Sequence, residues 1–186
     1  MLFRSIFRLS RLHQDPIPVR VSNEIVAECE KALIGSDLLI FADFNYGCLS
    51  QSLVENIIHL SKKNKIFVTA DCQSSSQIGK IEKYNKVNLV TPTERETRIC
   101  LKNNDDGLVV ISEKLRKFLN CNHVILKLGS EGIIIQTENN RISDGFETDR
   151  LPSLNLIPRD VAGAGDSLLS GSSLYLASGE IGRAHV

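Results

Sequence analysis

The chain has 186 residues, 42% of them hydrophobic and 24% charged, with a formal net charge of zero, as expected for one globular domain with a sizeable core. The balanced charge without a basic stripe argues against a nucleic-acid partner, and no apolar run approaches the ~20 residues that a membrane-spanning helix needs. Five widely spaced cysteines without a Cys-x-x-Cys pair argue against a disulfide framework or a zinc site and favour a reducing compartment, so we expect a cytoplasmic protein.

Short apolar runs alternate with amphipathic stretches along the chain. The runs that predict strands are residues 38–42, 66–70, 87–90, 124–128 and 133–135. The stretches that predict helices are residues 22–35, 50–64, 94–101, 108–119 and 167–177. Residues 141–158 are mixed and polar, which indicates a hairpin and a connection. This alternation predicts an α/β fold with a mostly parallel central sheet and helices on both faces.

Polar residues follow several of the predicted strands. Asp43 and Asp71 end two of them, residues 93–96 follow a third, and the glycine turn 129–132 follows a fourth. Ligands of parallel α/β sheets bind beyond the carboxyl ends of the strands. We therefore expect a binding site that combines these segments.

The stretch D-V-A-G-A-G-D at residues 160–166 opens the last predicted helix. Gly163, Ala164 and Gly165 carry little or no side chain, so an anion can reach the unpaired N–H groups of the helix N-terminus, where the peptide dipoles add positive potential. A carboxylate here would repel a phosphate unless it accepts a proton from the group that attacks that phosphate. The pattern favours a phosphoryl-transfer site with Asp166 as the base.

Other interpretations of this stretch exist. A glycine pair before a helix is often only a tight turn. A dinucleotide fingerprint needs a third glycine where Leu168 stands, which disfavours a Rossmann oxidoreductase, and no Walker A sequence occurs in the chain. The residues alone leave a turn and a catalytic site both open.

The same stretch resembles the D-[TS]-x-G-A-G-D signature of the PfkB (ribokinase-like) carbohydrate kinases. The resemblance implies that Asp166 activates a sugar hydroxyl, and that Gly163, Ala164 and Gly165 form the anion hole. It also implies that Asp160 helps to hold a monovalent cation such as K⁺. Val161 departs from the usual Thr or Ser, which removes a hydroxyl contact to phosphate.

Two further segments resemble motifs of this family. T-P-T-E-R-E at residues 91–96 is similar to T-P-N-x-x-E, which implies that Glu96 acts on Mg²⁺ through water, although Thr93 replaces the Asn. Pairing with the helix dipole is the alternative role of Glu96. L-K-L-G-S-E-G at residues 126–132 resembles the T-x-G-x-x-G nucleotide turn, and a glycine hairpin would give the same sequence. The expected nucleotide-binding residues are Lys127, Gly129, Ser130 and Gly132.

Within the family, residues 7–15 and 42–49 look like segments of the D-glycero-β-D-manno-heptose-7-phosphate kinases, the kinase domain of bifunctional ADP-heptose synthases. Residues 42–49 are similar to their S-D-Y-G-K-G-x-L loop, with Asn45 and Tyr46 in place of Gly and Lys, and Asp43 is expected on the substrate side. Asp71 matches the Asp of their V-D-P-K strand end, where Cys72 and Gln73 replace Pro and Lys.

The resemblance implies an ATP-dependent kinase for a sugar or sugar phosphate, with ATP and Mg²⁺ as cofactors and a homodimer as a candidate assembly. We expect residues 1–179 to be a partial kinase domain, truncated at both ends and inactive alone, and residues 180–186 to be a non-native tail. Two alternatives remain open: a nucleotide-binding protein without catalysis, and a PfkB kinase for another sugar such as fructose or ribose.

Overall fold

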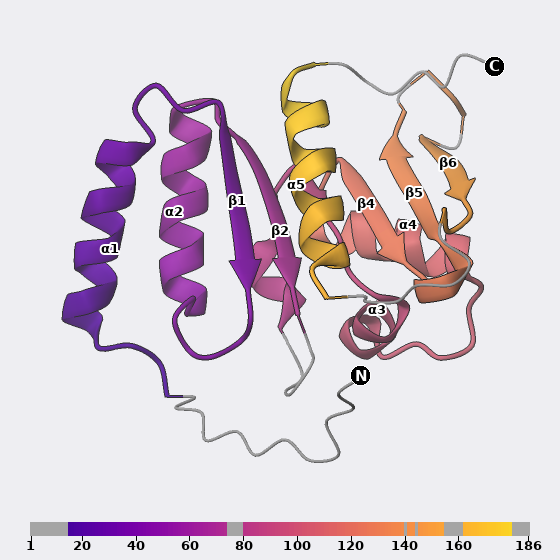
Figure 1. The fold of residues 1–186 in the computed structure, drawn as a ribbon, viewed down its shortest axis with the longest axis horizontal. Helices are drawn as coiled ribbons and strands as arrows, with labels where there is room; N and C mark the ends of the chain where they lie inside the picture. The colour runs from indigo at the N-terminus through magenta and orange to yellow at the C-terminus, as the bar shows by residue number, and fades with distance from the viewer. Residues whose placement is uncertain (1–14, 74–79, 140, 144, 155–161, 180–186) are drawn as a thin grey trace, which may run out of the picture.

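A computed structural model describes residues 15–73, 80–139, 141–143, 145–154 and 162–179 (Figure 1). Its strands are β1 Leu38–Asp43, β2 Phe67–Cys72, β3 Leu89–Val90, β4 His123–Lys127, β5 Ile133–Glu138 and β6 Phe146–Leu151. Its α-helices are α1 Val19–Ala32, α2 Gln51–Lys63, α3 Glu94–Leu101, α4 Leu108–Leu119 and α5 Ala164–Ala177. Two short 3₁₀ helices are η1 Ile81–Tyr84 and η2 Gly129–Glu131.

The six strands form one sheet whose spatial order follows the sequence, β1 to β6. β1 to β4 are parallel to one another because helices connect them, as parallel crossovers require. β5 and β6 pair antiparallel beyond β4 through short turns. The predicted α/β class and mostly parallel sheet are confirmed, with an antiparallel edge that residues 141–158 only suggested as a hairpin.

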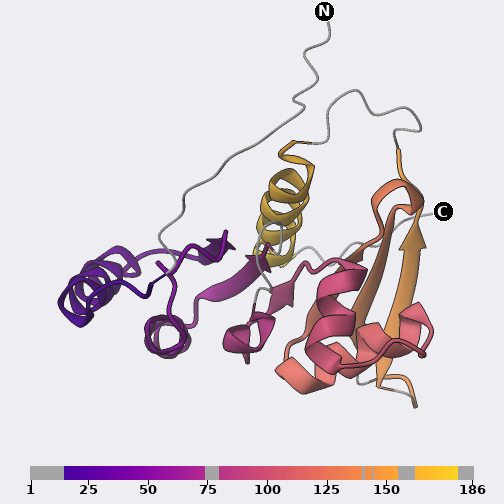
Figure 2. The same cartoon turned by 90° about the horizontal axis from the view of Figure 1, so that it is seen from below.

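Helices cover both faces of the sheet. Figure 2 shows α1, α2 and α4 on one side and α5 on the other, where α5 packs against β1 and β2. Leu169 and Ser173 on α5 are buried there, and Ser173 donates a hydrogen bond of 2.8 Å to the Thr69 hydroxyl on β2. The main apolar core lies between α2 and the sheet, and its largest fully buried side chain is Tyr84 of η1.

Local capping explains where most of the helices begin. The Ser50 hydroxyl accepts a hydrogen bond from the Leu53 amide at 3.4 Å and starts α2, as its position at the head of an amphipathic run predicts. α1 begins at Val19 rather than Ser22, because Pro18 presets the extended entry and its carbonyl accepts the Ser22 amide at 3.0 Å. α5 begins at Ala164 rather than Ser167, which places Asp166 inside its first turn.

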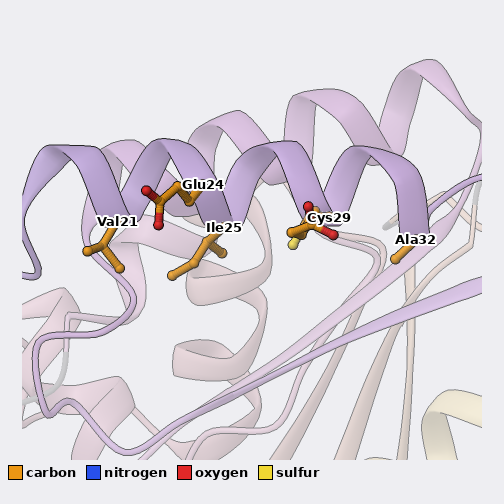
Figure 3. Close-up of a pocket in the computed structure, with 6 residues that line it drawn as sticks. Val21, Glu24, Ile25, Cys29 and Ala32 are labelled. Atoms are coloured by element: carbon orange, nitrogen blue, oxygen red, sulfur yellow. The ribbon is translucent and has the colours of Figure 1, made fainter.

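A groove of about 370 Å³ runs along α1 (Figure 3). All of its lining residues belong to that helix: Val21, Glu24, Ile25, Glu28, Cys29 and Ala32. Partial burial raises the pKa of the Cys29 thiol, which keeps it protonated near neutral pH. None of the predicted site residues lines this groove. The helices of the described ranges include none with the length and apolarity to cross a membrane.

Candidate active site at the carboxyl edge of the sheet

The first turn of α5 lies at the carboxyl ends of β1 and β2 (Figure 1). Gly163 is the N-cap residue, and its φ of 76° is in the left-handed region, which favours glycine. The first intrahelical hydrogen bond runs from the Ser167 amide to the Gly163 carbonyl at 2.9 Å. The amides of Ala164, Gly165 and Asp166 therefore have no acceptor within the helix, which makes this turn suited to an anion.

A cavity of about 690 Å³ opens in front of this turn. Its lining brings together residues from β2, α3, β4 and α5 and from the segments that follow β1 and β2. The lining residues are Phe44, Asp71, Gln73, Thr93, Arg95, Glu96, Lys127, Ala162, Gly163, Gly165 and Asp166. Five residues predicted for the site, namely Glu96, Lys127, Gly163, Gly165 and Asp166, thus line one cavity.

An ion pair forms one wall of the cavity. Lys127 Nζ lies 2.8 and 2.9 Å from the two carboxylate oxygens of Asp71, whose side chain is only 1% exposed, against 17% for Lys127. Burial raises the pKa of Asp71, and the Lys127 ammonium opposes that shift. A Cβ atom at Gly165 would lie 3.6 Å from Lys127 Nζ. The pair thus sits against the helix N-terminus, so Lys127 adds positive charge beside the free amides.

Glu96 closes a capping box at the start of α3. Its carboxylate accepts a hydrogen bond of 2.7 Å from the Thr93 amide, and its own amide donates to the Thr93 hydroxyl at 3.2 Å. The Thr-x-x-Glu spacing is a sequence signal for this arrangement. The Thr93 side chain thus caps α3, a role that Asn can also fill, while Glu96 still reaches the cavity.

Asp43 lies beneath the cavity rather than in its lining. Its side chain is 4% exposed and pairs with Lys83, accepts a hydrogen bond of 2.8 Å from the Tyr84 hydroxyl, and accepts the Asn45 amide at 2.9 Å. The next residue, Phe44, lines the cavity, and its ring stacks on Tyr46 with 6.2 Å between centroids. An exposed aromatic pair at a cavity wall can pack against the apolar face of a sugar or a base.

The glycine turn 129–132 joins β4 to β5. Gly129 and Gly132 have φ angles of 62° and 93°, and the Leu128 amide donates to the Gly132 carbonyl at 2.9 Å. Ser130 is exposed. Gly129, Ser130 and Gly132 are outside the described lining of the cavity, so the hairpin role that the sequence also allowed is visible here.

Replacing each of the two turn glycines by alanine should lower the free energy of unfolding by a different amount. A Cβ at Gly132 would lie 2.0 Å from the Leu151 carbonyl oxygen, whereas a Cβ at Gly129 would meet nothing within 4 Å. Both substitutions carry the ~1–2 kcal/mol cost of a left-handed L-residue, and we expect Gly132→Ala to cost about 1–3 kcal/mol more through the clash. Urea unfolding of the two variants measures this difference. Equal losses would show that the β6 end moves aside without cost.

Three polar or aromatic lining residues had no individual role assigned to them from the sequence. Arg95, an exposed residue in the first turn of α3, adds a second cation to the wall. Phe44 supplies an apolar surface. Gln73 donates from its side-chain amide to Asp166 Oδ1 at 3.2 Å. Each lies near a predicted strand end, since Phe44 follows Asp43, Gln73 comes two residues after Asp71, and Arg95 belongs to the segment 93–96.

Several predictions fall outside the described residues. Asp160, the expected cation ligand, and Val161 belong to the undescribed range 155–161, and the expected tail 180–186 is also outside. Within the ranges that the structure describes, no group of three or more His, Cys, Asp or Glu side chains converges as a metal site.

Comparison with known proteins places the chain in a family. Residues 21–185 match the family described as pfkB family carbohydrate kinase. The bifunctional protein HldE of Campylobacter fetus subsp. fetus is 29% identical over 163 residues, which are 86% of this chain and 33% of that protein. HldE of Helicobacter hepaticus is 26% identical over 182 residues, which are 95% of this chain and 35% of that protein. The chain thus spans about a third of the length of these relatives.

Solved structures share the fold. The ribokinase of Arabidopsis thaliana, complexed with ribose and ATP, gives a TM-score of 0.66 at 16% identity, over 83% of this chain and 47% of that one. Phosphofructokinase-2 from Escherichia coli, in complex with fructose-6-phosphate, gives a TM-score of 0.66 at 15% identity, over 85% of this chain and 51% of that one. The architecture is therefore ribokinase-like, and because the family match takes in residues 21–185, the chain belongs to the pfkB family of carbohydrate kinases.

Proposed function

We propose that the protein containing this chain is an ATP-dependent kinase that phosphorylates a hydroxyl of a sugar phosphate, with heptose 7-phosphate as the first candidate substrate. The observation that carries the proposal is the single cavity lined by the α5 N-terminus, the Asp166 carboxylate and the Lys127 ammonium. Anion-binding amides, a base and a cation are the elements that phosphoryl transfer requires. The similarity to two HldE proteins supports the choice of heptose.

In this proposal Asp166 accepts the proton of the sugar hydroxyl as that oxygen attacks the γ-phosphate. The amides of Ala164 and Gly165, with the dipole of α5, stabilise the negative charge on the transferred group. A carboxylate at a positive helix end is a weak base. That basicity is sufficient because the transition state of phosphoryl transfer is loose and needs little early deprotonation.

The residues of the cavity fit ATP and Mg²⁺. Lys127 and Arg95 are cations that can meet phosphate oxygens, and the Glu96 carboxylate offers a hard oxygen ligand of the kind Mg²⁺ prefers. Bound Mg²⁺ would neutralise phosphate charge, and it is normally held by one or two carboxylates together with phosphates and water. Glu96 is the residue that we propose acts on the ion through water.

The test is ADP release by the product of the complete reading frame that contains these residues, assayed over a panel of free and phosphorylated sugars. Turnover with a heptose 7-phosphate supports the narrow proposal. Turnover with fructose, ribose or another sugar instead keeps the kinase activity and replaces the substrate. ATP binding without turnover on any sugar would overturn the proposed reaction.

That last outcome is the second candidate function, a nucleotide-binding protein without catalysis. The observation that favours it is the capping box, in which the main-chain amide of Thr93 occupies one oxygen of Glu96, and Thr93 stands where the family motif has Asn. Isothermal titration with ATP, alongside the sugar panel, separates the two candidates.

A further inference from the structure

The side chain of Gln73 reaches from the end of β2 to the first turn of α5. Its Nε2 donates to Asp166 Oδ1 at 3.2 Å, a contact between residues 93 positions apart in the sequence. We propose that Gln73 is a positioning residue that fixes the rotamer of the Asp166 carboxylate. This inference rests on the proposed role of Asp166 as the base.

The main chain of Gln73 is held on both sides. Its amide donates to the Asp43 carbonyl at 2.8 Å, which extends the β1–β2 ladder by one residue. Its carbonyl accepts a hydrogen bond from Asn45 Nδ2. Gln73 is therefore anchored where the strand ends, and its side chain starts from a fixed point.

Asn45 is itself locked by a tight turn. Its φ is 57°, a left-handed conformation that Asn tolerates better than most residues, and its amide donates to Asp43 Oδ1 at 2.9 Å. Its side-chain amide also lies 3.4 Å from the Cys72 sulfur. The side chain is thereby aimed across the β1–β2 pair at the Gln73 carbonyl.

This series of contacts begins at Asp43. Lys83 and the Tyr84 hydroxyl, both on η1, hold its other oxygen, and the carboxylate is buried beneath the cavity. A buried carboxylate with three partners has one rotamer. A series of hydrogen bonds thus connects the protein core to the proposed base, from Asp43 through Asn45 and Gln73 to Asp166. In this proposal Asp43 supports the base and does not contact the substrate.

The need for such support follows from where Asp166 lies. It is an exposed residue in a helix first turn, and its carboxylate would otherwise sample several rotamers. A neutral amide donor on Oδ1 selects one of them without adding charge, and presents Oδ2 to the acceptor hydroxyl. Since a misplacement of about 1 Å can cost about 100-fold in rate, we expect loss of this single contact to lower kcat by about 10-fold.

The test substitutes Gln73→Met, which keeps the length of the side chain and removes the donor. On the best substrate of the sugar panel, we expect kcat to fall about 10-fold and the KM for ATP to stay within about 2-fold, because Gln73 meets the base rather than the nucleotide. Gln73→Asn, which keeps a neutral amide donor on a side chain one methylene shorter, should recover part of kcat. Gln51→Met, the same change on the exposed face of α2 where Gln51 bonds Glu55, is the matched control and should leave kcat unchanged.

A second variant separates positioning from a general structural effect. Asn45→Gly tolerates the positive φ but removes the hydrogen bond to the Gln73 carbonyl. We expect a smaller fall in kcat, about 3-fold, with an unchanged thermal midpoint. A fall in stability with no change in kcat would overturn the positioning role of this turn.

The double variant Gln73→Met/Asp166→Asn completes the experiment. If Gln73 acts through Asp166, the double variant is no slower than Asp166→Asn. If the two losses multiply, or Gln73→Met keeps full kcat while Asp166→Asn loses it, the Gln73 proposal is overturned and the base stands. If Asp166→Asn itself turns over at the normal rate, the proposed base and its positioning residue are both wrong.

Discussion

Replacing Asp166 by Asn is expected to lower the kcat of the proposed kinase reaction by about 10²- to 10⁴-fold, because the amide keeps the shape of the side chain but cannot accept the proton of the attacking hydroxyl. Substrate binding should change little, since the α5 amides and Lys127 remain. The variant should also stay folded, because a carboxylate in a helix first turn contributes only ~0.3–1 kcal/mol through the dipole. Initial rates with saturating ATP and sugar measure the effect.

The matched control is Asp105→Asn, the same change at an exposed loop residue between α3 and α4. It should retain the full rate. Near-normal turnover by the Asp166 variant would remove that residue from the mechanism, and the anion-binding turn would then have to act with another base.

Replacing Lys127 by Met is expected to lower the free energy of unfolding by about 3–5 kcal/mol, because it leaves the buried Asp71 carboxylate without its partner. Chemical denaturation at neutral pH measures the loss. The surface pair Lys31–Glu28, at 2.7 Å but with both side chains more than 70% exposed, gives the control. Lys31→Met should cost less than about 1 kcal/mol.

The loss of stability in the Lys127→Met variant should be larger at neutral pH than at acidic pH. Burial raises the pKa of Asp71 in the folded protein, and the Lys127→Met substitution removes the positive charge that opposes this rise. Folding then favours the protonated carboxyl, so the deficit is complete above the raised pKa and shrinks as the pH falls through it. Adding Asp71→Asn should recover stability at neutral pH. A deficit that is constant with pH would mean that lost packing, not lost charge, is its cause.

The sequence predicted elements best where local signals agreed. The bounds of α3 and α4 match the prediction because each helix has a clear start, Thr-Pro-Thr before one and Gly107 before the other. β3 is shorter than its apolar run, two residues against four, because Val87 packs into the core without joining the ladder. β6 was expected only as part of a hairpin within residues 141–158, without bounds, because its residues are mostly polar and partly exposed, as on an edge strand.

The features of the candidate site were also predictable only in part. That Asp166, Glu96 and Lys127 share one cavity could be predicted, because parallel strands end at one edge of the sheet. The Asp71–Lys127 pair could not, since it depends on side chains that reach across β3, the short strand between their two strands. The burial of Asp43 also required tertiary structure, because its partners come from η1, some 40 residues later.

α5 packs against two strands that lie far from it in the sequence, which affects the order of folding and the rates of amide hydrogen exchange. Neighbouring strands of the sheet are neighbours in sequence, so the sheet can grow from local contacts, whereas α5 must return from the end of the chain to β1 and β2. Contacts of such long sequence separation form late, because the entropy of closing a long loop opposes them. We expect the amides of α5, on which only Leu169 and Ser173 are buried, to exchange with deuterium sooner than those of β2 and β4. The proposed catalytic turn would then form last on folding and open first on local unfolding.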